Sequence, residues 1–469
     1  MPPNVLLVVF DAARADAFEP YGGRPGSTPA VAELARRGSA HRCMHATASW
    51  TVPSHAAMLS GLLPRATGLL QAPGGTPHGC RPRMEELRER LLPEVLRRAG
   101  YSTGAVSANF WLREASGFDI GFDEFVSTRS RRQPGMDGGR LRDRVRWDLD
   151  ALRARSDDGA AEAGRVLGER LARPAQKPFF WFVNLIECHS PYLPPHPFND
   201  LGPIGRLRAA EEARSHLTMD AIWRVSAGGW DIPDGALERM RRLYLASIRA
   251  LDSWLGGVLE TLEQAGALEE TIVIVTSDHG ENLGEGGLFG HVFSLDDRLI
   301  RVPFVSAGPV ALEPRRVASL AQLPELIAAA VGLEEHPWAG GTPPGDVAVA
   351  QFDPPAGPDD PRVLAAVERW GLGEEALERI STELACATDG RRKLVRRGSW
   401  EELFDLEADP RELSPLAPGA GGEVAALREA LEHPTVLAAS PGADRDQVAR
   451  PDADELRDLE QRMRQLGYL

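Results

Sequence analysis

The sequence predicts an α/β fold with a mostly parallel sheet. Short apolar runs rich in β-branched and aromatic residues recur at 4–10, 102–107, 179–185, 271–276 and 302–308. Continuous runs of this kind are typical of parallel strands buried on both faces. Longer helical patterns separate them, and such alternation favours a sheet covered by helices. Because 43% of the 469 residues are hydrophobic, the chain can build a sizeable core.

The predicted helices have recognisable ends. Segment 27–38 places Ser27 or Thr28 before Pro29 and ends at Gly38. Capping residues and proline favour helix starts, and glycine favours the position after a helix end. Segment 91–100 ends in the same way, and a long helical pattern runs from 236 to a glycine at 266.

The composition changes after residue 332, so residues 1–332 are predicted to form the main α/β domain. Residues 333–380 are rich in proline, glycine and aspartate and are predicted to be a connection with at most one short strand. Residues 381–469 are predicted to form a small α+β subdomain with an antiparallel sheet. Its terminal helices are expected at 424–433 and 453–466.

Charge and cysteine usage limit the partners and the compartment. A formal net charge of -15 argues against nucleic-acid or anionic-membrane partners, which require a basic surface. The four cysteines lie far apart without a Cys-x-x-Cys spacing, so neither a disulfide framework nor a structural zinc site is indicated. The apolar run at 5–10 is too short for a membrane span and lacks the features of a signal peptide. We therefore expect a cytoplasmic protein, and the sequence carries no signal for its oligomeric state.

Polar side chains follow three of the predicted strands. Ligands bind beyond the carboxyl ends of the strands in an open α/β sheet. The residues at these ends and in the glycine-rich loop that follows are Asp11, Glu187, His189, Asp278, His279 and His291. For any one of these residues alone, the simpler interpretation is that it caps a loop or belongs to the core. Their convergence favours a metal site instead, since carboxylate oxygen and imidazole nitrogen suit Zn²⁺ or Mn²⁺.

The stretch TASWTVPSHAAMLSG, residues 47–61, predicts a short helix with Pro53 in its first turn and Gly61 after its end. Thr51 then lies at the helix N-terminus, where free N–H groups favour an anion. A nucleophile that attacks a charged ester is expected at such a position. The alternative is that Thr51 is a plain N-cap.

Several motifs together carry a family resemblance: Asp11 after the first strand, then TVPSH, HSPYLPP, TSDHGENLGEGGLFGH, RVPF and ELFDLEADPRE. Their order and approximate spacing over residues 4–415 resemble sulfatases of the alkaline phosphatase superfamily. The resemblance implies an alkaline-phosphatase-like α/β/α sandwich and a metal-dependent ester hydrolase.

The chain departs from sulfatases at informative positions. Thr51 stands where sulfatases carry the Cys or Ser that is oxidised to formylglycine, and threonine does not undergo that conversion. Asn109 lies where sulfatases place a Lys-x-His pair, and Ala12 stands where they often have a second aspartate.

The residues that remain resemble the single-metal set of phosphoester-cleaving relatives: Asp11, Thr51, Asp278 and His279. Phosphonate monoester hydrolases share its Asp, Asp and His. Phosphoethanolamine transferases use a threonine, with histidines that align with His189 and His291. Nucleotide pyrophosphatase/phosphodiesterases pair a threonine with an asparagine that resembles Asn109.

These observations predict a nucleophilic Thr51 whose hydroxyl pKa is lowered by Zn²⁺ or Mn²⁺, with Ca²⁺ as an alternative. Asn109 and His55 are expected as oxyanion partners. His189 and His291 would protonate the leaving group or, with Glu187, hold a second metal. Threonine cannot release sulfate by collapsing to an aldehyde, so its intermediate requires a second displacement, which phosphoryl groups undergo readily.

The predicted function is hydrolysis of a small anionic phosphodiester or phosphonate monoester through a phosphothreonine. The alternatives are a formylglycine-independent sulfatase, a phosphotransferase that uses an acceptor other than water, and a non-catalytic binding protein on the same scaffold.

Overall fold

The computed structural model describes residues 2–72, 75–128, 141–155, 157–172, 177–417 and 424–438. Its centre is a seven-stranded sheet with the order β2-β11-β7-β1-β6-β4-β5. The strands are β1 (Asn4–Phe10), β2 (Ser39–Ala40), β4 (Ser102–Ser107), β5 (Glu124–Ser127), β6 (Phe179–Leu185), β7 (Thr271–Thr276) and β11 (Phe304–Ala307). The five strands from β7 to β5 in that order are parallel, which confirms the mostly parallel sheet.

The direction of the last predicted strand is wrong in the sequence analysis. β11 pairs antiparallel with β7, with Val305 opposite Val275, and β2 pairs antiparallel with β11. A parallel return needs a crossover over one face of the sheet. The chain between β7 and β11 instead forms the short elements β8 (Asn282–Leu283), β9 (Phe289–Gly290), α11 (Asp297–Ile300) and β10 (Arg301–Val302).

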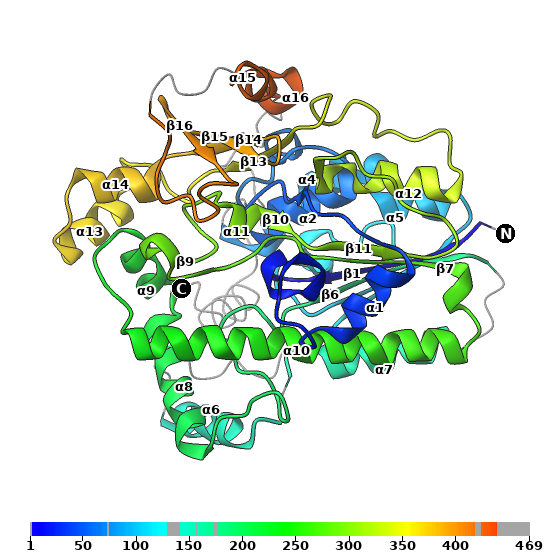
Figure 1. Ribbon diagram of the computed structural model, residues 1–469, viewed down its shortest axis with the longest axis horizontal. Coiled ribbons are helices and arrows are strands. Elements are labelled where there is room, and N and C mark those ends of the chain that lie inside the picture. The colour runs from blue at the N-terminus through cyan, green and yellow to red at the C-terminus, as the bar shows by residue number, and fades with distance from the viewer. Residues whose placement is uncertain are drawn as a thin grey trace.

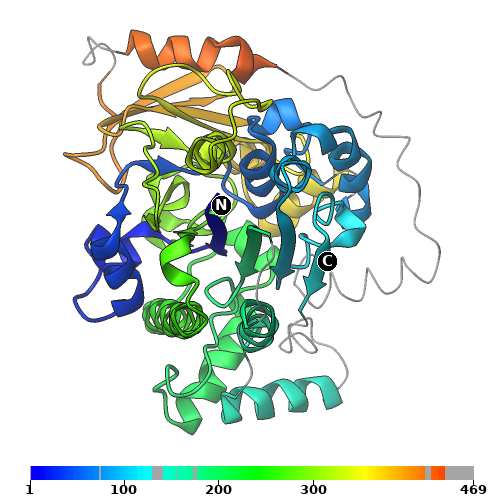
Figure 2. The same cartoon turned by 90° about the vertical axis from the view of Figure 1, so that its right-hand side faces the viewer.

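Helices cover both faces of the central sheet, as the two views of Figures 1 and 2 show. One layer contains α1 (Pro29–Arg37), α7 (Ala160–Leu171) and α10 (Asp234–Gln264), and the other contains α2 (Thr51–Ser60), α5 (Leu92–Arg98) and α12 (Leu323–Val331). Alternate residues of β1 explain the two layers: Leu6 packs in the core on one side, and Leu7 packs in the core on the other. The α/β/α sandwich is therefore confirmed.

The remaining elements surround this sandwich. They are β3 (Met44–His45), α3 (Pro64–Thr67), α4 (Arg81–Glu86), α6 (Leu141–Arg153), α8 (Pro203–His216), α9 (Met219–Ser226) and β12 (Ala318–Ser319). Among the described helices, none has both the length and the apolar character needed to cross a membrane.

The C-terminal region forms an antiparallel sheet with the order β13-β14-β15-β16. Its strands are β13 (Ala348–Phe352), β14 (Leu384–Thr388), β15 (Arg392–Arg397) and β16 (Trp400–Asp405), followed by α15 (Ala425–Glu432) and α16 (Pro434–Leu437). The antiparallel sheet and the first terminal helix are as predicted. The helix expected at 453–466 lies outside the described residues.

Segment 333–380 is more structured than the sequence analysis predicted. Besides β13, it contains α13 (Pro361–Trp370) and α14 (Glu374–Ser381). Val363 and Val367 of α13 and Ile380 of α14 share one apolar cluster. This burial stabilises helices in a segment whose proline and glycine content predicted a connection.

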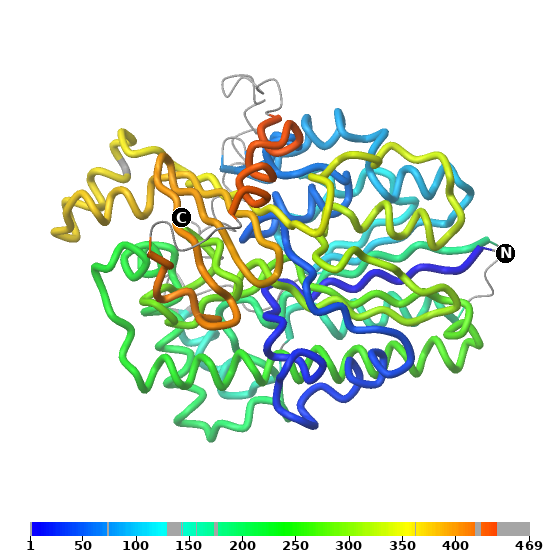
Figure 3. Tube along the Cα trace, turned by 45° about the horizontal axis from the view of Figure 1, so that its top comes forward, coloured from blue at the N-terminus to red at the C-terminus, as the bar shows by residue number. Residues whose placement is uncertain are grey.

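The C-terminal sheet packs closely on the main sandwich, as the orange strands in Figure 3 show. Ala57 of α2 lies in the same apolar cluster as Leu394 of β15. The ammonium group of Lys393 donates to the carbonyl oxygen of Leu295, 2.8 Å away, in the segment between β9 and α11. The two parts share a core, and the boundaries at 332 and 380 stay a prediction.

Candidate active site

Four neighbouring parallel strands deliver polar residues to one edge of the sheet. Asp278 follows β7, Asp11 follows β1, His189 follows β6 and Asn109 follows β4. Since β7, β1, β6 and β4 are adjacent in this order, residues far apart in the sequence meet where the sequence analysis expected a ligand site.

Two of these residues, Asp11 and Asp278, form a compact cluster with His279. Asp11, Asp278 and His279 are fully buried, and one ligand atom from each lies within 4.8 Å of the other two. His279 Nε2 is 3.3 Å from Asp278 Oδ2 and 3.8 Å from Asp11 Oδ1. None of these three atoms has a hydrogen-bond partner among the described residues. Buried polar atoms are normally paired, so the convergence of three such atoms fits a bound cation.

The electrostatics of the cluster agree with a cation. Burial, together with the nearby Asp11 carboxylate, raises the pKa of Asp278 well above its usual range. Burial and the neighbouring His291 lower the pKa of His279, so its ring stays neutral. His279 Nδ1 lies 2.8 Å from the Gly280 carbonyl oxygen, to which it donates, leaving the Nε2 lone pair directed at the carboxylates.

The two carboxylates of this cluster are fixed by neighbouring amide groups. Asp11 Oδ2 accepts from Asn109 Nδ2 at 2.7 Å and from Asn184 Nδ2 at 3.3 Å. The backbone N–H groups of Ala12 and His279 donate to Asp278 Oδ1 at 3.2 Å and 2.9 Å. These bonds leave Asp11 Oδ1 and Asp278 Oδ2 for a metal.

Asn184 is a site residue that the sequence analysis missed. It lies in β6, where every residue is buried and all the others are apolar. A single amide in such a strand needs buried partners, and this exception to the apolar pattern was the available signal.

Thr51 is the first residue of α2 and is 2% exposed. The N-cap is Trp50, whose side chain makes no capping hydrogen bond in the described part of the chain. The alternative that Thr51 is a plain N-cap is therefore wrong. Thr51 Oγ1 instead lies 3.4 Å from Asn109 Nδ2, the amide that also binds Asp11. The structure thus brings Thr51 and Asn109 to the cluster of Asp11, Asp278 and His279.

His55 lies one turn into α2 and is fully buried. Its Nδ1 is 2.9 Å from the Thr51 carbonyl oxygen and 3.4 Å from Asp278 Oδ2, and its Nε2 is 3.4 Å from Asn184 Nδ2. Burial lowers the pKa of His55 to about 4, so the ring is neutral. Both ring nitrogens contact protein groups, an arrangement that favours a positioning role for His55.

Three histidine rings lie next to one another in space at the site, with His291 between His279 and His189. The ring centroid of His291 is 4.6 Å from that of His279 and 5.0 Å from that of His189. Glu281 Oε1 is 3.0 Å from His291 Nδ1. Burial opposes a charge on His291, but the adjacent Glu281 carboxylate raises its pKa above the ordinary value. Glu281, which the sequence analysis did not select, orients one of the two predicted proton donors.

Glu187, a predicted ligand of a second metal, contacts a helix end. Its Oε1 accepts from the backbone N–H of Ala160, the first residue of α7, at 2.7 Å. A carboxylate at this position is stabilised by the helix dipole. The structure therefore brings His189 and His291 together and engages one oxygen of Glu187 with α7.

The chain resembles known proteins in sequence and in fold. The sulfatase family model matches residues 3–333. The choline-sulfatase of Rhizobium meliloti (strain 1021) is 25% identical in an alignment of 465 positions, which covers 90% of this chain and 84% of that protein.

Two solved phosphonate monoester hydrolases have a similar fold. The structure from Silicibacter pomeroyi has a TM-score of 0.61 and 20% identity, covering 92% of this chain and 95% of the other. The structure from Agrobacterium radiobacter has a TM-score of 0.58 and 20% identity, covering 89% of this chain and 92% of the other. Sulfate-ester and phosphonate-ester enzymes thus both lie among the similar proteins.

Proposed function

The chain belongs to the sulfatase family. From this premise we propose that it hydrolyses phosphoesters, specifically a phosphodiester or a phosphonate monoester, through a covalent phosphothreonine at Thr51. Membership identifies it as an ester hydrolase. The choice of phosphorus over sulfur is our inference from the threonine.

The observation that carries this proposal is the amide of Asn109. Its Nδ2 is 2.7 Å from Asp11 Oδ2 and 3.4 Å from Thr51 Oγ1. One donor therefore links a predicted metal ligand to the predicted nucleophile. A hydroxyl at the start of α2 also lies where the helix N–H groups attract an anionic ester.

The chemistry proceeds in two displacements at phosphorus. Thr51 loses its hydroxyl proton to water, its oxygen forms the new bond to phosphorus, and the ester bond to the leaving group breaks. His291 or His189 gives the departing oxygen a proton. Water then attacks the phosphothreonine, and the bond between Thr51 and phosphorus breaks. One proton of the attacking water returns to the histidine, and the Thr51 oxygen takes back a proton from solvent to restore its hydroxyl.

A divalent cation held by Asp11, Asp278 and His279 would supply Lewis acidity, lowering the pKa of the threonine hydroxyl and offsetting negative charge on the ester. We propose Zn²⁺ or Mn²⁺, since the donor set combines oxygen and nitrogen, with Ca²⁺ as an alternative. His189 and His291 supply protons in this proposal. Their use with Glu187 as a second metal site is the competing role.

We also propose a cytoplasmic location. The four cysteines are all free, and three of them are buried. Free thiols are the usual state in a reducing compartment.

Sulfate-ester hydrolysis without formylglycine is the second candidate. Similarity to a choline-sulfatase over 90% of the chain supports it. It would use the same cluster but would require the threonine intermediate to be cleared by attack at sulfur.

Rapid quenching followed by intact-mass analysis tests the covalent step. During turnover of bis-p-nitrophenyl phosphate, we expect a phosphoryl adduct that peptide mapping places on Thr51. Thr51→Ser keeps a hydroxyl at this position and should form the adduct on serine, whereas Thr51→Ala should form none. Turnover without an adduct on wild-type protein at any quench time would overturn the mechanism.

A further inference from the structure

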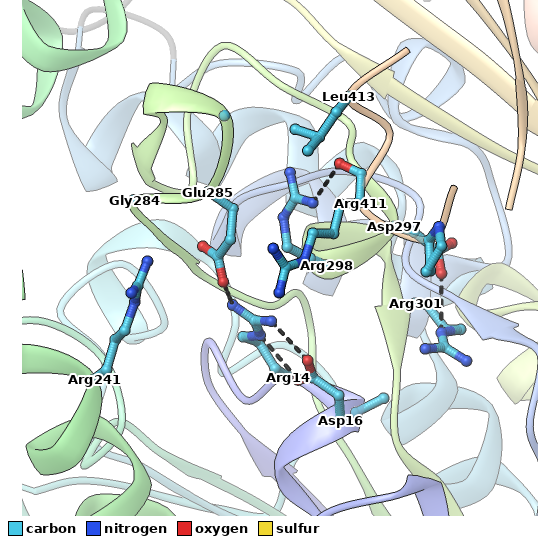
Figure 4. Close-up of a pocket in the computed structure, with 13 residues that line it drawn as sticks. Arg14, Asp16, Arg241, Gly284, Glu285, Asp297, Arg298, Arg301, Arg411 and Leu413 are labelled. Carbon is cyan, nitrogen blue, oxygen red and sulfur yellow. Dashed lines mark hydrogen bonds and ion pairs between the residues drawn. The ribbon is translucent and has the colours of Figure 1, made fainter. Parts of the chain in front are cut away.

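A cavity of about 580 Å³ lies behind the loop that carries the metal ligands. It is bounded by residues 14–16 after β1, by residues 284–286 after β7 and by Arg241 of α10 (Figure 4). The rest of its wall consists of Asp297, Arg298, Arg301, Pro410, Arg411 and Leu413. Five arginines and three carboxylates line it, so its wall has an excess of positive charge. The whole chain has a net charge of -15, which makes this local excess unusual.

Three of the arginines are held by carboxylates. Arg14 pairs with Asp16 at 2.6 Å and with Glu285 at 2.7 Å. Arg301 pairs with Asp297 at 2.9 Å, and Arg298 pairs with Asp296 at 2.7 Å. These pairs fix the wall of the cavity and largely neutralise its charge.

The other two arginines have no carboxylate partner in the part of the chain that the structure describes. Arg241 donates from Nε to the carbonyl oxygen of Leu283 at 2.8 Å, which orients the guanidinium and leaves its terminal nitrogens available. Arg411 contributes its carbonyl oxygen to Arg298 at 2.7 Å. Both side chains come from exposed positions at the rim of the cavity.

We propose that this cavity is a second anion site, which binds a compact, doubly charged oxyanion group, phosphate or sulfate, through the guanidinium groups of Arg241 and Arg411, which both line it. Two planar guanidinium groups without carboxylate partners can each donate two hydrogen bonds to such a group. The ion-paired arginines hold the wall in place. This inference does not depend on the ester that the metal cluster cleaves.

The site is separate from the metal cluster but shares a loop with it. Glu281 shows the relationship: its side-chain Oε1 is 3.0 Å from His291 Nδ1, whereas its carbonyl oxygen is 3.3 Å from a terminal nitrogen of Arg14. Gly280 is required at this approach, because a Cβ there would lie 1.9 Å from the Arg298 carbonyl oxygen. The catalytic face and the arginine-lined face of the loop are therefore different.

Isothermal titration of the full-length, metal-loaded protein with inorganic phosphate, and separately with sulfate, tests the proposal. The double variant Arg241→Gln with Arg411→Gln should bind at least one of these anions at least about tenfold more weakly at this site. The matched control is Arg249→Gln with Arg391→Gln. It removes the same charge, from α10 and from the turn between β14 and β15, but changes no residue of the cavity wall.

Competitive inhibition of p-nitrophenyl ester hydrolysis by the same anion reports on the metal cluster independently. The inhibition constant of the anion should be equal in wild-type protein and in both double variants. Equal anion binding by the two double variants would overturn the proposal. So would a matching loss of binding and of competitive inhibition in the cavity variant, because the cavity would then be part of the substrate cleft.

Discussion

His279 Nε2 and Asp11 Oδ1 lie 3.8 Å apart, both buried and both without a hydrogen-bond partner among the described residues. They come from the ends of adjacent strands, β7 and β1. A direct contact would be weak at this distance, and a cation between them would satisfy both atoms.

The first prediction concerns that cation. Protein purified without chelator should contain at least one transition-metal ion per chain by elemental analysis. Asp278→Asn should lose both metal and turnover, because the amide removes one charge from the ligand set. Full activity of a metal-free preparation would rule the site out as the catalytic metal centre.

The second prediction concerns Asn184, whose amide donates to Asp11 Oδ2 at 3.3 Å and faces His55 Nε2 at 3.4 Å. Asn184→Leu fills a similar volume but removes both contacts, and it should weaken metal binding by about 10–100-fold, as loss of supporting hydrogen bonds does at metal sites. Metal titration under competition with a chelator measures this.

Asn4→Leu is the matched control. Asn4 is a buried asparagine at the amino end of β1, where it accepts from the backbone of Phe179. Its replacement affects stability at the far end of the sheet and should leave metal affinity unchanged. Equal losses of metal affinity in the two variants would mean that reduced protein stability, and not the contacts of Asn184, causes the loss.

The elements that the sequence predicts correctly are those whose own residues determine them. β1 and β7 are continuous apolar runs, and α1 carries proline at its start and glycine at its end. The direction of β11 could not be predicted, because it depends on whether the preceding chain crosses the sheet. α13 and α14 depend on mutual burial that local composition conceals.

The site shows the same limit. Asp11, Asp278 and His279 follow strands and are recognisable in sequence. Asn184 contributes through a contact with Asp11, which is distant in the sequence. Glu281 contributes through a contact with His291 that forms only when the loop between them folds. Sequence position alone does not show which atoms such side chains reach.

The third prediction concerns the nucleophile. Thr51→Ala should lower kcat by about 10³-fold or more, as deletion of other catalytic nucleophiles does. Thr51→Ser keeps the hydroxyl and should retain much more activity than Thr51→Ala. Steady-state kinetics at equal metal loading measures both. Near-normal activity of Thr51→Ala would mean that water is the direct nucleophile.

The fourth prediction separates the two roles proposed for His189 and His291. As proton donors, they should matter most for poor leaving groups, because an activated p-nitrophenolate needs little protonation. His189→Ala and His291→Ala should therefore slow cleavage of alkyl esters more than cleavage of p-nitrophenyl esters. Equal losses on both substrates would favour metal ligation.

His216→Gln is the control for these variants. His216 packs against Trp230 in a tilted arrangement, with ring centroids 4.8 Å apart, and contacts none of the three histidines of the site in the described interactions. Its replacement should leave the cleavage rates of both substrate classes unchanged. A selective loss of activity in the site variants would then reflect leaving-group chemistry.

The last prediction concerns substrate charge. Phosphodiesters or phosphonate monoesters should be hydrolysed with higher kcat/KM than sulfate monoesters, with phosphate monoesters between them or lower. A singly charged ester suits one cation and few cationic side chains, whereas a doubly charged monoester calls for a second metal or a bidentate arginine. Arg14 and Arg298 are the arginines near the site motifs, and the structure pairs them with the carboxylates of Asp16, Glu285 and Asp296. Comparing kcat/KM for bis-p-nitrophenyl phosphate, p-nitrophenyl phosphate and p-nitrophenyl sulfate at equal metal loading measures the order. A clear preference for the sulfate ester would replace our proposal with a sulfatase that works without formylglycine, since the three substrates share one leaving group and differ in the charge and central atom of the transferred group.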